Sequence, residues 1–392
     1  MAGTEGLSLS DPFTVPTSHW HELPDGRIQC DVCPRACRLR EGQRGLCFVR
    51  GRVDDQIVLA SYGRSSGFCV DPVEKKPLNH FLPGSPVLSF GTAGCNLACR
   101  FCQNWDISKS RVTDTLSAAA SPDALAAVAD RLGCRSIAFT YNDPTIFFEY
   151  AGDIAQACAE RGIRAVAVSA GFMNAEPRTE FYRHIDAANI DLKGFTEEFY
   201  DKIALAKLPQ VLETLQYLHH ETDVWLEVTT LLIPGHNDSD AELARQSAWI
   251  AEHLGVEVPL HFSAFHPDFK MRDVPPTPPE TLTRARRIAM DHGLRFVYTG
   301  NVSDPVGQTT TCPGCGAAVI VRDRYRLDGY RLTDSGGCQG CGRQLPGVFD
   351  GPAGTWGPRR RPVRLAPPAM RPGVHDRRVG PAREAALKGV GT

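Results

Sequence analysis

Short apolar runs alternate with helix-like segments from about residue 87 to residue 300. Each apolar run is about five residues long and is followed by polar turn residues, and the longer segments repeat their apolar positions at helical spacing. This alternation predicts parallel βα units. Six or seven units are fewer than a closed eight-stranded barrel needs, so we expect an incomplete barrel that is open on one side. The expected strands are 87–91, 136–140, 164–169, 188–192, 225–232, 259–265 and 295–299, and the expected helices are 121–132, 146–161, 178–184, 197–219, 239–253 and 279–292.

The segments on either side of this region have a different composition. Cysteines gather before and after it, and past Phe349 the chain is rich in Pro, Gly, Ala and Arg, as in Arg359-Arg360-Arg361. Such a composition is typical of disorder. We therefore expect a polar leader (1–20), an N-terminal Cys-rich module (21–80), the partial barrel (81–305), a zinc-ribbon-like module (306–350) and a disordered basic tail (351–392).

Composition limits the classes of protein to consider. The hydrophobic share of 42% and the charged share of 22% are ordinary for a globular protein, and a net charge of −2 gives no general attraction to nucleic acid or membrane. Residues 1–20 show no secretory signal, and no apolar stretch reaches membrane-spanning length. We expect a cytoplasmic protein with no membrane partner. Fourteen cysteines in spaced clusters then favour metal ligation over disulfides.

Three thiols follow the first expected strand of the barrel. Cys95, Cys99 and Cys102 have the spacing C-x3-C-x2-C, and no fourth cysteine lies nearby in the sequence. Such a set suits a cubane iron–sulfur cluster in which three irons bind one thiolate each and the fourth iron stays open. A zinc knuckle that borrows a distant His is the alternative. The motif resembles the signature of radical S-adenosylmethionine (SAM) enzymes.

Polar residues also stand at the ends of the later expected strands. Because parallel strands end at the same face, these residues are expected to face the three-cysteine loop, where they would make a site for a zwitterionic, ribose-bearing ligand. They include Asn142, Asp143, Ser169, Asp191, Lys193 and His266.

Two further cysteine clusters predict metal sites. Cys30, Cys33, Cys37 and Cys47 fall in a short segment with too little apolar content to fold alone, so a structural zinc or an auxiliary iron–sulfur cluster would supply stability. Four free, reduced thiols are the other interpretation. Near the other end, two C-x2-C knuckles are 22 residues apart, as in a four-cysteine zinc ribbon; a rubredoxin-like iron site is the alternative. The ribbon cysteines are Cys312, Cys315, Cys338 and Cys341.

Together these motifs resemble the radical SAM component of the AmmeMemoRadiSam system, which is related to the pyruvate formate-lyase activating enzymes. The resemblance extends from Cys30 to about Phe349. It implies an α/β fold, a partial (β/α)6 barrel with the N-terminal four-Cys module and the C-terminal zinc-ribbon-like module. It also implies a [4Fe–4S] cluster and SAM as cofactors. The implied reaction is reductive cleavage of SAM to a 5′-deoxyadenosyl radical, which abstracts hydrogen from a substrate.

The resemblance assigns roles to individual positions. It implies that Cys95, Cys99 and Cys102 hold the cluster and that Phe101 packs near the adenine. The segment 141–144 replaces the family's methionine-binding Gly-Gly-Glu, so the amine contact falls to Asn142 or Asp143. It also implies SAM contacts for Asp191 and Lys193 near the carboxylate and for His266, and we expect a further contact from Ser169 because of its place at a strand end. No catalytic residue is assigned, because the radical comes from SAM.

The substrate is either a small molecule or a side chain of a partner protein. The resemblance implies Memo-like and AMMECR-like partners and a one-electron donor such as flavodoxin or ferredoxin. Three other functions stay open: a glycyl-radical activase, an RNA-modifying radical enzyme, and an interaction protein in which every cysteine cluster holds zinc.

Overall fold

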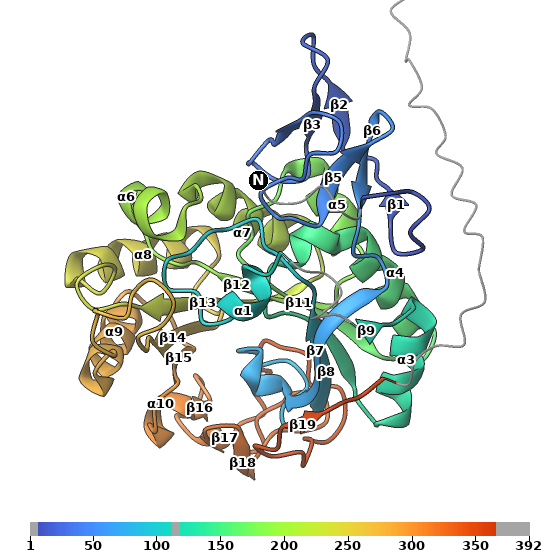
Figure 1. Ribbon diagram of the computed structural model, residues 1–392. Coiled ribbons are helices and arrows are strands. Elements are labelled where there is room, and N and C mark those ends of the chain that lie inside the picture. The colour runs from blue at the N-terminus through green and yellow to red at the C-terminus, as the bar shows by residue number, and fades with distance from the viewer. Residues whose placement is uncertain (1–6, 112–117, 366–392) are drawn as a thin grey trace, which may run out of the picture.

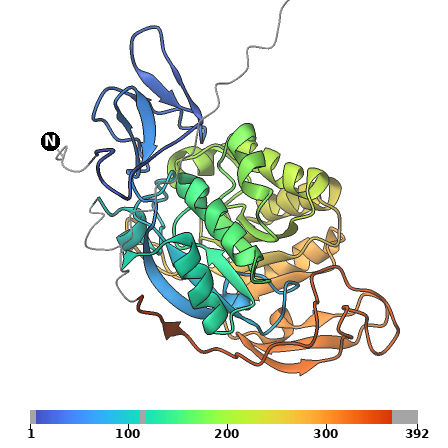
Figure 2. The same cartoon turned by 90° about the vertical axis from the view of Figure 1, so that its right-hand side faces the viewer.

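One large sheet with helices on its outer side forms the centre of the molecule in this computed structural model, which describes residues 7–111 and 118–365 (Figures 1 and 2). Seven consecutive strands of the sheet run parallel, in the order in which the chain makes them. They are β8 (Pro86–Gly91), β10 (Ser136–Phe139), β11 (Arg164–Ser169), β12 (Ala187–Asp191), β13 (Trp225–Leu232), β14 (Leu260–Ala264) and β15 (Val297–Gly300). All seven strands predicted from the apolar runs are thereby confirmed.

The sheet does not close into a barrel. On its far side β8 pairs with the antiparallel β7 (Arg64–Pro72), which also pairs with β9 (Ala118–Ala119) and β19 (Arg361–Pro362). At the opposite edge β15 pairs with β14 alone among the described strands. The C-terminal module lies between these two edges (Figure 1). It contains α10 (Pro305–Gln308), β16 (Thr310–Thr311), β17 (Ala318–Asp323) and β18 (Arg326–Tyr330).

Helices connect the parallel strands and bury their apolar faces on the sheet. Two of them begin at a serine cap: Ser121 Oγ accepts from Ala124 N and Ser239 Oγ from Glu242 N. None of the described helices is long and apolar enough to cross a membrane. The connecting helices are α3 (Pro122–Arg131), η2 (Pro144–Phe147), α4 (Phe148–Ala159), α5 (Ala175–Tyr182), α6 (Glu197–Phe199), η3 (Tyr200–Ala204), α7 (Leu208–Glu221), α8 (Asp240–His253) and α9 (Pro279–Asp291).

The predicted helix 197–219 is interrupted. Helix α6 and the short η3 end at Leu205, whose φ is +54°, and α7 starts again three residues later with Pro209 in its first turn. Pro209 has no N–H to donate to the carbonyl of Leu205 four residues earlier, so one continuous helix cannot run through this point. This break supplies a carbonyl at Leu205, which accepts a hydrogen bond from Arg35 of the N-terminal module.

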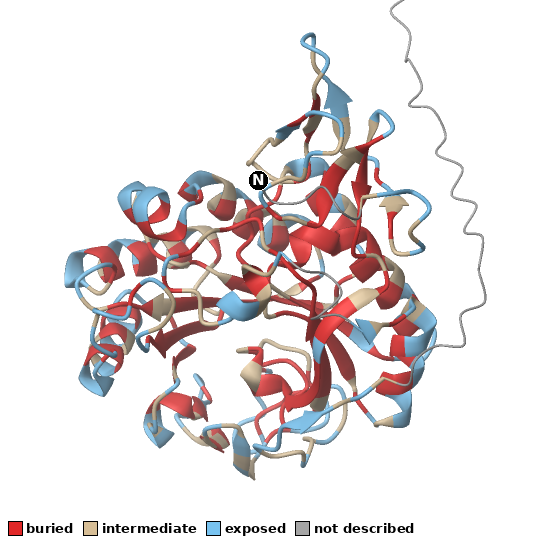
Figure 3. Ribbon diagram, in the orientation of Figure 1, coloured by how far each residue is buried: buried red, intermediate tan, exposed pale blue. Residues whose placement is uncertain are grey.

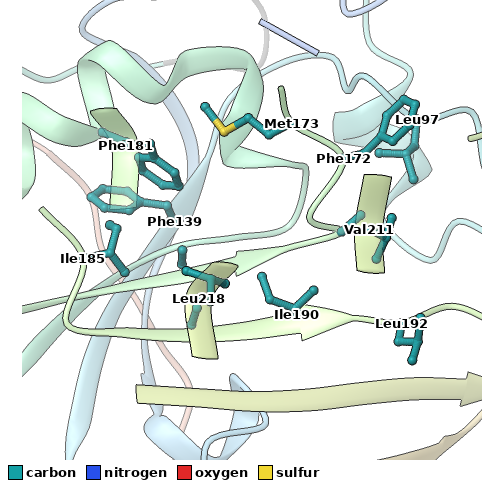
Figure 4. Packing of buried hydrophobic residues seen from close by; sticks show 14 of the residues in the cluster. Leu97, Phe139, Phe172, Met173, Phe181, Ile185, Ile190, Leu192, Val211 and Leu218 are labelled. Atoms are coloured by element: carbon teal, nitrogen blue, oxygen red, sulfur yellow. The ribbon is translucent and has the colours of Figure 1, made fainter. Parts of the chain in front are cut away.

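Buried side chains hold the sheet and helices together (Figure 3). Figure 4 shows Ile190 of β12 and Leu192, which directly follows that strand, near Val211 and Leu218 of α7, with Leu97 of the cysteine loop near Phe172. Each of these six side chains is at most 3% exposed. Burying one such side chain stabilises the fold by about 1.5–3 kcal/mol, so the loop that carries the three cysteines is packed into the main core.

The N-terminal module contains only short strands. Strand β1 (Val15–Pro16) pairs with β6, so the predicted polar leader is ordered from residue 7 and packs on this module, whereas residues 1–6 lie outside the described residues. The other strands are β2 (Trp20–Glu22), β3 (Ile28–Cys30), β4 (Arg38–Leu39), β5 (Arg50–Val53) and β6 (Gln56–Leu59).

The predicted disordered tail requires a correction. Residues 351–365 are ordered, because β19 adds to the free edge of β7 and Val363 N donates to Phe68 O at 2.9 Å. Trp356 N also donates to Gly84 O at 3.1 Å. Composition alone predicted disorder, but an unpaired strand edge offers backbone partners that composition does not reveal. The rest of the predicted tail, residues 366–392, lies outside the described residues.

Candidate functional site

A cavity of about 630 Å³ opens at the carboxyl ends of the parallel strands. Its lining includes the three loop cysteines, Cys95, Cys99 and Cys102, which are the only cysteines among the described residues around it. Residues that the sequence placed at the strand ends line the same cavity. They are Asn142, Asp143, Ser169, Asp191 and Lys193, together with Phe101.

The cysteine loop is fixed by its backbone. Gly94 adopts φ +89°, a left-handed conformation that favours glycine, and it directly precedes Cys95. Leu97 N donates to Cys95 Sγ at 3.4 Å, and Cys102 Sγ lies 3.1 Å from the Ser108 hydroxyl, on the short helix α1 (Trp105–Ser108). Backbone geometry and these two contacts position the loop, and all three of its cysteines are free thiols.

Burial shapes the acidity of these thiols. It raises the pKa of Cys95, and it raises the pKa of Cys99 to about 12 although the nearby Lys193 acts in the opposite direction. Thiols in such surroundings stay protonated until a cation binds them, because a metal stabilises the thiolate directly.

The spacing of the loop cysteines fits a multinuclear centre better than a single ion. Within residues 7–111 and 118–365, only the ribbon cysteines bring three or more His, Cys, Asp or Glu ligand atoms all within 4.8 Å of one another. The loop cysteines are thus spread more widely, as expected when each thiolate binds a different iron of one cluster. The residues present fit the cluster that the motif predicts.

Asn142 and Asp143 connect the strand ends to one another. Asn142 accepts a hydrogen bond from Thr92 N and donates to Gly94 O at 2.8 Å, which joins the end of β10 to the cysteine loop. The Asp143 carboxylate accepts from Ser169 Oγ at 3.0 Å and from Ala170 N at 2.8 Å. Each side chain is buried and also faces the cavity, so it has both a structural role and a free surface for a ligand.

Asp191 and Lys193 form an ion pair on the cavity wall. Lys193 Nζ lies 2.8 Å from Asp191 Oδ2 and 5.8 Å from the centroid of the Phe101 ring. Burial alone would lower the pKa of Lys193, but the Asp191 carboxylate outweighs burial and raises it. Lys193 therefore presents a permanent positive charge beside the loop cysteines.

His266 is exposed and does not line the cavity. The histidine that does is His261 on β14, which sequence analysis did not single out. His261 Nε2 lies 2.6 Å from Glu227 Oε2, and that carboxylate also accepts from His80 N at 2.8 Å. Both His261 and Glu227 lie inside apolar strands. A charged residue within a buried strand is the sequence signal that could have identified them.

Cationic side chains also line the cavity. Lys75 and Lys76, on and just after η1 (Val73–Lys75), both pair with the buried Asp71. The ribbon module and the ordered part of the tail add Arg322, Arg324, Tyr325 and Arg360. Thr229 also lines this cavity, is 6% exposed, and its hydroxyl has no partner among the described residues. Thr229 is the sheet neighbour of Asp191, so its hydroxyl is available to a ligand beside the Asp191–Lys193 pair.

The ribbon cysteines have the geometry of a single-ion site. Cys312 Sγ lies 3.6 Å from Cys341 Sγ, and Cys315 Sγ lies 3.8 Å from Cys338 Sγ. Tetrahedral zinc with Zn–S bonds of about 2.3 Å requires sulfur atoms about 3.8 Å apart. The N-terminal set, Cys30, Cys33, Cys37 and Cys47, lines a separate cavity of about 20 Å³.

Comparisons with known proteins agree with this geometry. The sequence profile of the radical SAM superfamily matches residues 90–247, which include the three loop cysteines. An uncharacterized protein of Methanocaldococcus jannaschii (MJ0808) is 38% identical over 327 residues, or 83% of this chain and 97% of that protein.

Two solved structures are distantly similar. One is a domain of pyruvate-formate lyase-activating enzyme from Bacteroides vulgatus, with 19% identity, 42% of this chain and 98% of that chain covered, and a TM-score of 0.37. The other is a radical SAM methyltransferase from Sphaerobacter thermophilus. Its sequence identity is 15%, the match covers 76% of this chain and 81% of that chain, and the TM-score is 0.46.

Proposed function

Because this chain belongs to the radical SAM superfamily, whose members are enzymes, we propose that it cleaves SAM reductively at the loop cysteines and uses the resulting radical on a substrate. The observation that carries the proposal is the shared cavity: three thiols and the polar ends of three neighbouring strands line one space of about 630 Å³. A [4Fe–4S] cluster with one open iron, when bound there, would supply one electron that breaks the sulfonium C5′–S bond, giving methionine and a 5′-deoxyadenosyl radical.

The chain's own residues bind and orient SAM in this proposal. The Asp143 carboxylate, which lines the cavity, accepts from the SAM ammonium group, while Asn142 holds the cysteine loop beside it. Lys193 pairs with the SAM carboxylate, and Asp191 keeps Lys193 in place. Phe101 packs against the adenine.

Ser169 contacts SAM from the end of β11 in this proposal. His266 is assigned no contact, because it lies exposed and outside the cavity. The substrate then occupies the rest of the cavity, whose lining includes His261 and, from the C-terminal module, Arg322 and Arg324. A small molecule or the side chain of a partner protein fits this arrangement.

The finer family assignment belongs to the same proposal. We place the chain in the AmmeMemoRadiSam group, with Memo-like and AMMECR-like partners, a flavodoxin- or ferredoxin-type electron donor and a cytoplasmic location. The sulfur distances support zinc at the ribbon cysteines. We propose the domain limits expected from the sequence, except that residues 351–365 do not belong to a disordered tail.

Product analysis tests the proposal. Protein reconstituted anaerobically with iron and sulfide should be brown, should absorb near about 400 nm, and should form 5′-deoxyadenosine from SAM and dithionite. Cys99→Ala should no longer form 5′-deoxyadenosine and should hold fewer irons per chain than the wild type. Cys158→Ala is the matched control, because Cys158 is a fully buried thiol on α4 outside the three clusters. A colourless protein that holds only zinc and releases no 5′-deoxyadenosine would contradict the proposal.

A further inference from the structure

The N-terminal four-cysteine set surrounds one small and mostly apolar cavity. The four thiols line it together with side chains such as Val32, Leu39 and Ile146. Cys30 N donates to Cys37 O at 2.9 Å, and Gly45 N donates to Arg50 O at 2.8 Å, so the backbone turns back twice to bring the four cysteines together. All four are free thiols. Four convergent thiols without a disulfide are an arrangement that a metal centre explains.

The module is built from short strands. Its strands β1 to β6 are two to four residues long. Apolar residues such as Ile28, Val49 and Ile57 anchor it in the main core, and modules with so little regular structure commonly gain further stability from a disulfide or a metal.

The spacing of the thiols distinguishes between the two metals that the sequence left open. All four cysteines of this set are among the described residues, yet no three of their sulfur atoms lie within 4.8 Å of one another. The ribbon cysteines of the same chain do meet that limit, with sulfur pairs at 3.6 and 3.8 Å. The two four-cysteine sets therefore differ in size, and only the ribbon set has the dimensions of a zinc site.

We propose that Cys30, Cys33, Cys37 and Cys47 hold a second iron–sulfur cluster, a [4Fe–4S] centre with every iron bound to a protein thiolate. In a four-iron cubane each thiolate binds a different iron, so the four sulfur atoms lie farther apart than around one ion. A fully ligated cluster leaves no iron for SAM, and this site therefore differs from the one at the loop cysteines in its response to SAM.

The proposed second site is attached directly to the SAM site. Asn96, the residue after Cys95, lines the cavity of the N-terminal set. Arg35, which lies between Cys33 and Cys37, donates through Nε to Asn96 O at 2.8 Å. On the other side, Gly94 packs so closely on the backbone of Cys47 that no side chain fits between them. Ligation of the N-terminal set would therefore also fix the backbone on both sides of Cys95.

Metal analysis and electron paramagnetic resonance (EPR) test this proposal without an activity assay. Reconstituted wild-type protein should contain about eight irons and about one zinc per chain. The triple variant Cys95→Ala/Cys99→Ala/Cys102→Ala should keep about four irons, with an EPR signal after dithionite reduction that SAM does not change. Cys134→Ala, which removes a buried thiol outside all clusters, should keep the wild-type iron content.

The complementary variant Cys33→Ser/Cys37→Ser should retain an EPR signal that SAM does change. If that variant fails to fold, the triple variant decides alone. A wild-type protein with about four irons and two zincs, or a triple variant without iron, would overturn the second cluster. Neither outcome bears on SAM cleavage at the loop cysteines, so the two proposals can fail separately.

Discussion

Gly94→Ala should damage the protein far more than an ordinary glycine substitution. Gly94 has φ +89°, and a Cβ atom there would overlap the carbonyl oxygen of Cys47, well inside the 3.0 Å that real Cβ atoms keep. A left-handed alanine costs about 1–2 kcal/mol, and overpacking a buried contact adds about 1–3 kcal/mol. The combined loss is about 2–5 kcal/mol, and part of it falls on the position of Cys95.

Gly133→Ala separates these two contributions. Gly133 has a similar φ of +66°, but a Cβ atom there would meet nothing within 4 Å, so this variant should lose only about 1–2 kcal/mol. At about 2 °C for each kcal/mol, the thermal midpoint should fall by about 4–10 °C for Gly94→Ala and by about 2–4 °C for Gly133→Ala. Differential scanning calorimetry measures both midpoints on proteins reconstituted in parallel.

Iron content and 5′-deoxyadenosine formation should follow the same order. Gly133→Ala should match the wild type in both, whereas Gly94→Ala should lose iron and activity because the backbone beside Cys95 must move. Equal midpoints and equal iron contents in the two variants would refute the close packing of the cysteine loop on Cys47.

Three other substitutions test separate parts of the structure. Arg50→Met leaves the Glu149 carboxylate buried without its bidentate partner and should lower the free energy of unfolding by about 3–5 kcal/mol. The thermal midpoint should fall accordingly, and an unchanged midpoint would contradict the buried ion pair. Burial alone would raise the pKa of Glu227, but the hydrogen bond and charge of His261 outweigh it and lower that pKa. The ionised Glu227 therefore stabilises the folded protein above its unfolded pKa of about 4.3, and this stabilisation is lost as the pH falls through its lower pKa in the folded state. In Glu227→Gln the thermal midpoint should consequently fall less steeply on the acid side of a plot against pH. A plot identical to that of the wild type would contradict the ionised Glu227–His261 pair. Cys338→Ser should release about one zinc per chain while dithionite-driven SAM cleavage persists, and retention of that zinc would count against the ribbon site.

The fold of the central region could be predicted because its signal is local. Each parallel strand is a short apolar run, and each connecting helix carries its own apolar face, so periodicity identified all seven strands. The break at Leu205 was missed because the helical pattern continues across it, while Pro209 in the next turn was the available sign. The order of residues 351–365 was missed because it depends on the distant edge of β7.

Only those residues of the candidate site that directly follow a parallel strand could be predicted from the sequence. Asn142, Asp143, Asp191 and Lys193 all line the cavity, since parallel strands end at one face. His266 has a similar place in the sequence, yet it lies beyond the end of β14 and points to solvent. Arg322 reaches the cavity because the C-terminal module packs between the two sheet edges, and Arg360 because β19 pairs with β7; no local pattern encodes either contact.

Whether SAM binds an open iron at the loop cysteines is tested most directly by electron–nuclear double resonance of the reduced protein. The SAM carries ¹⁷O in its carboxylate and ¹⁵N in its amino group. The Cys30→Ser/Cys33→Ser/Cys37→Ser variant would remove any signal from the N-terminal set. If SAM binds the iron that lacks a protein thiolate, both labels should show hyperfine coupling to the cluster spin. A cluster spin with no coupling to either label, at SAM concentrations that saturate binding, would contradict this assignment.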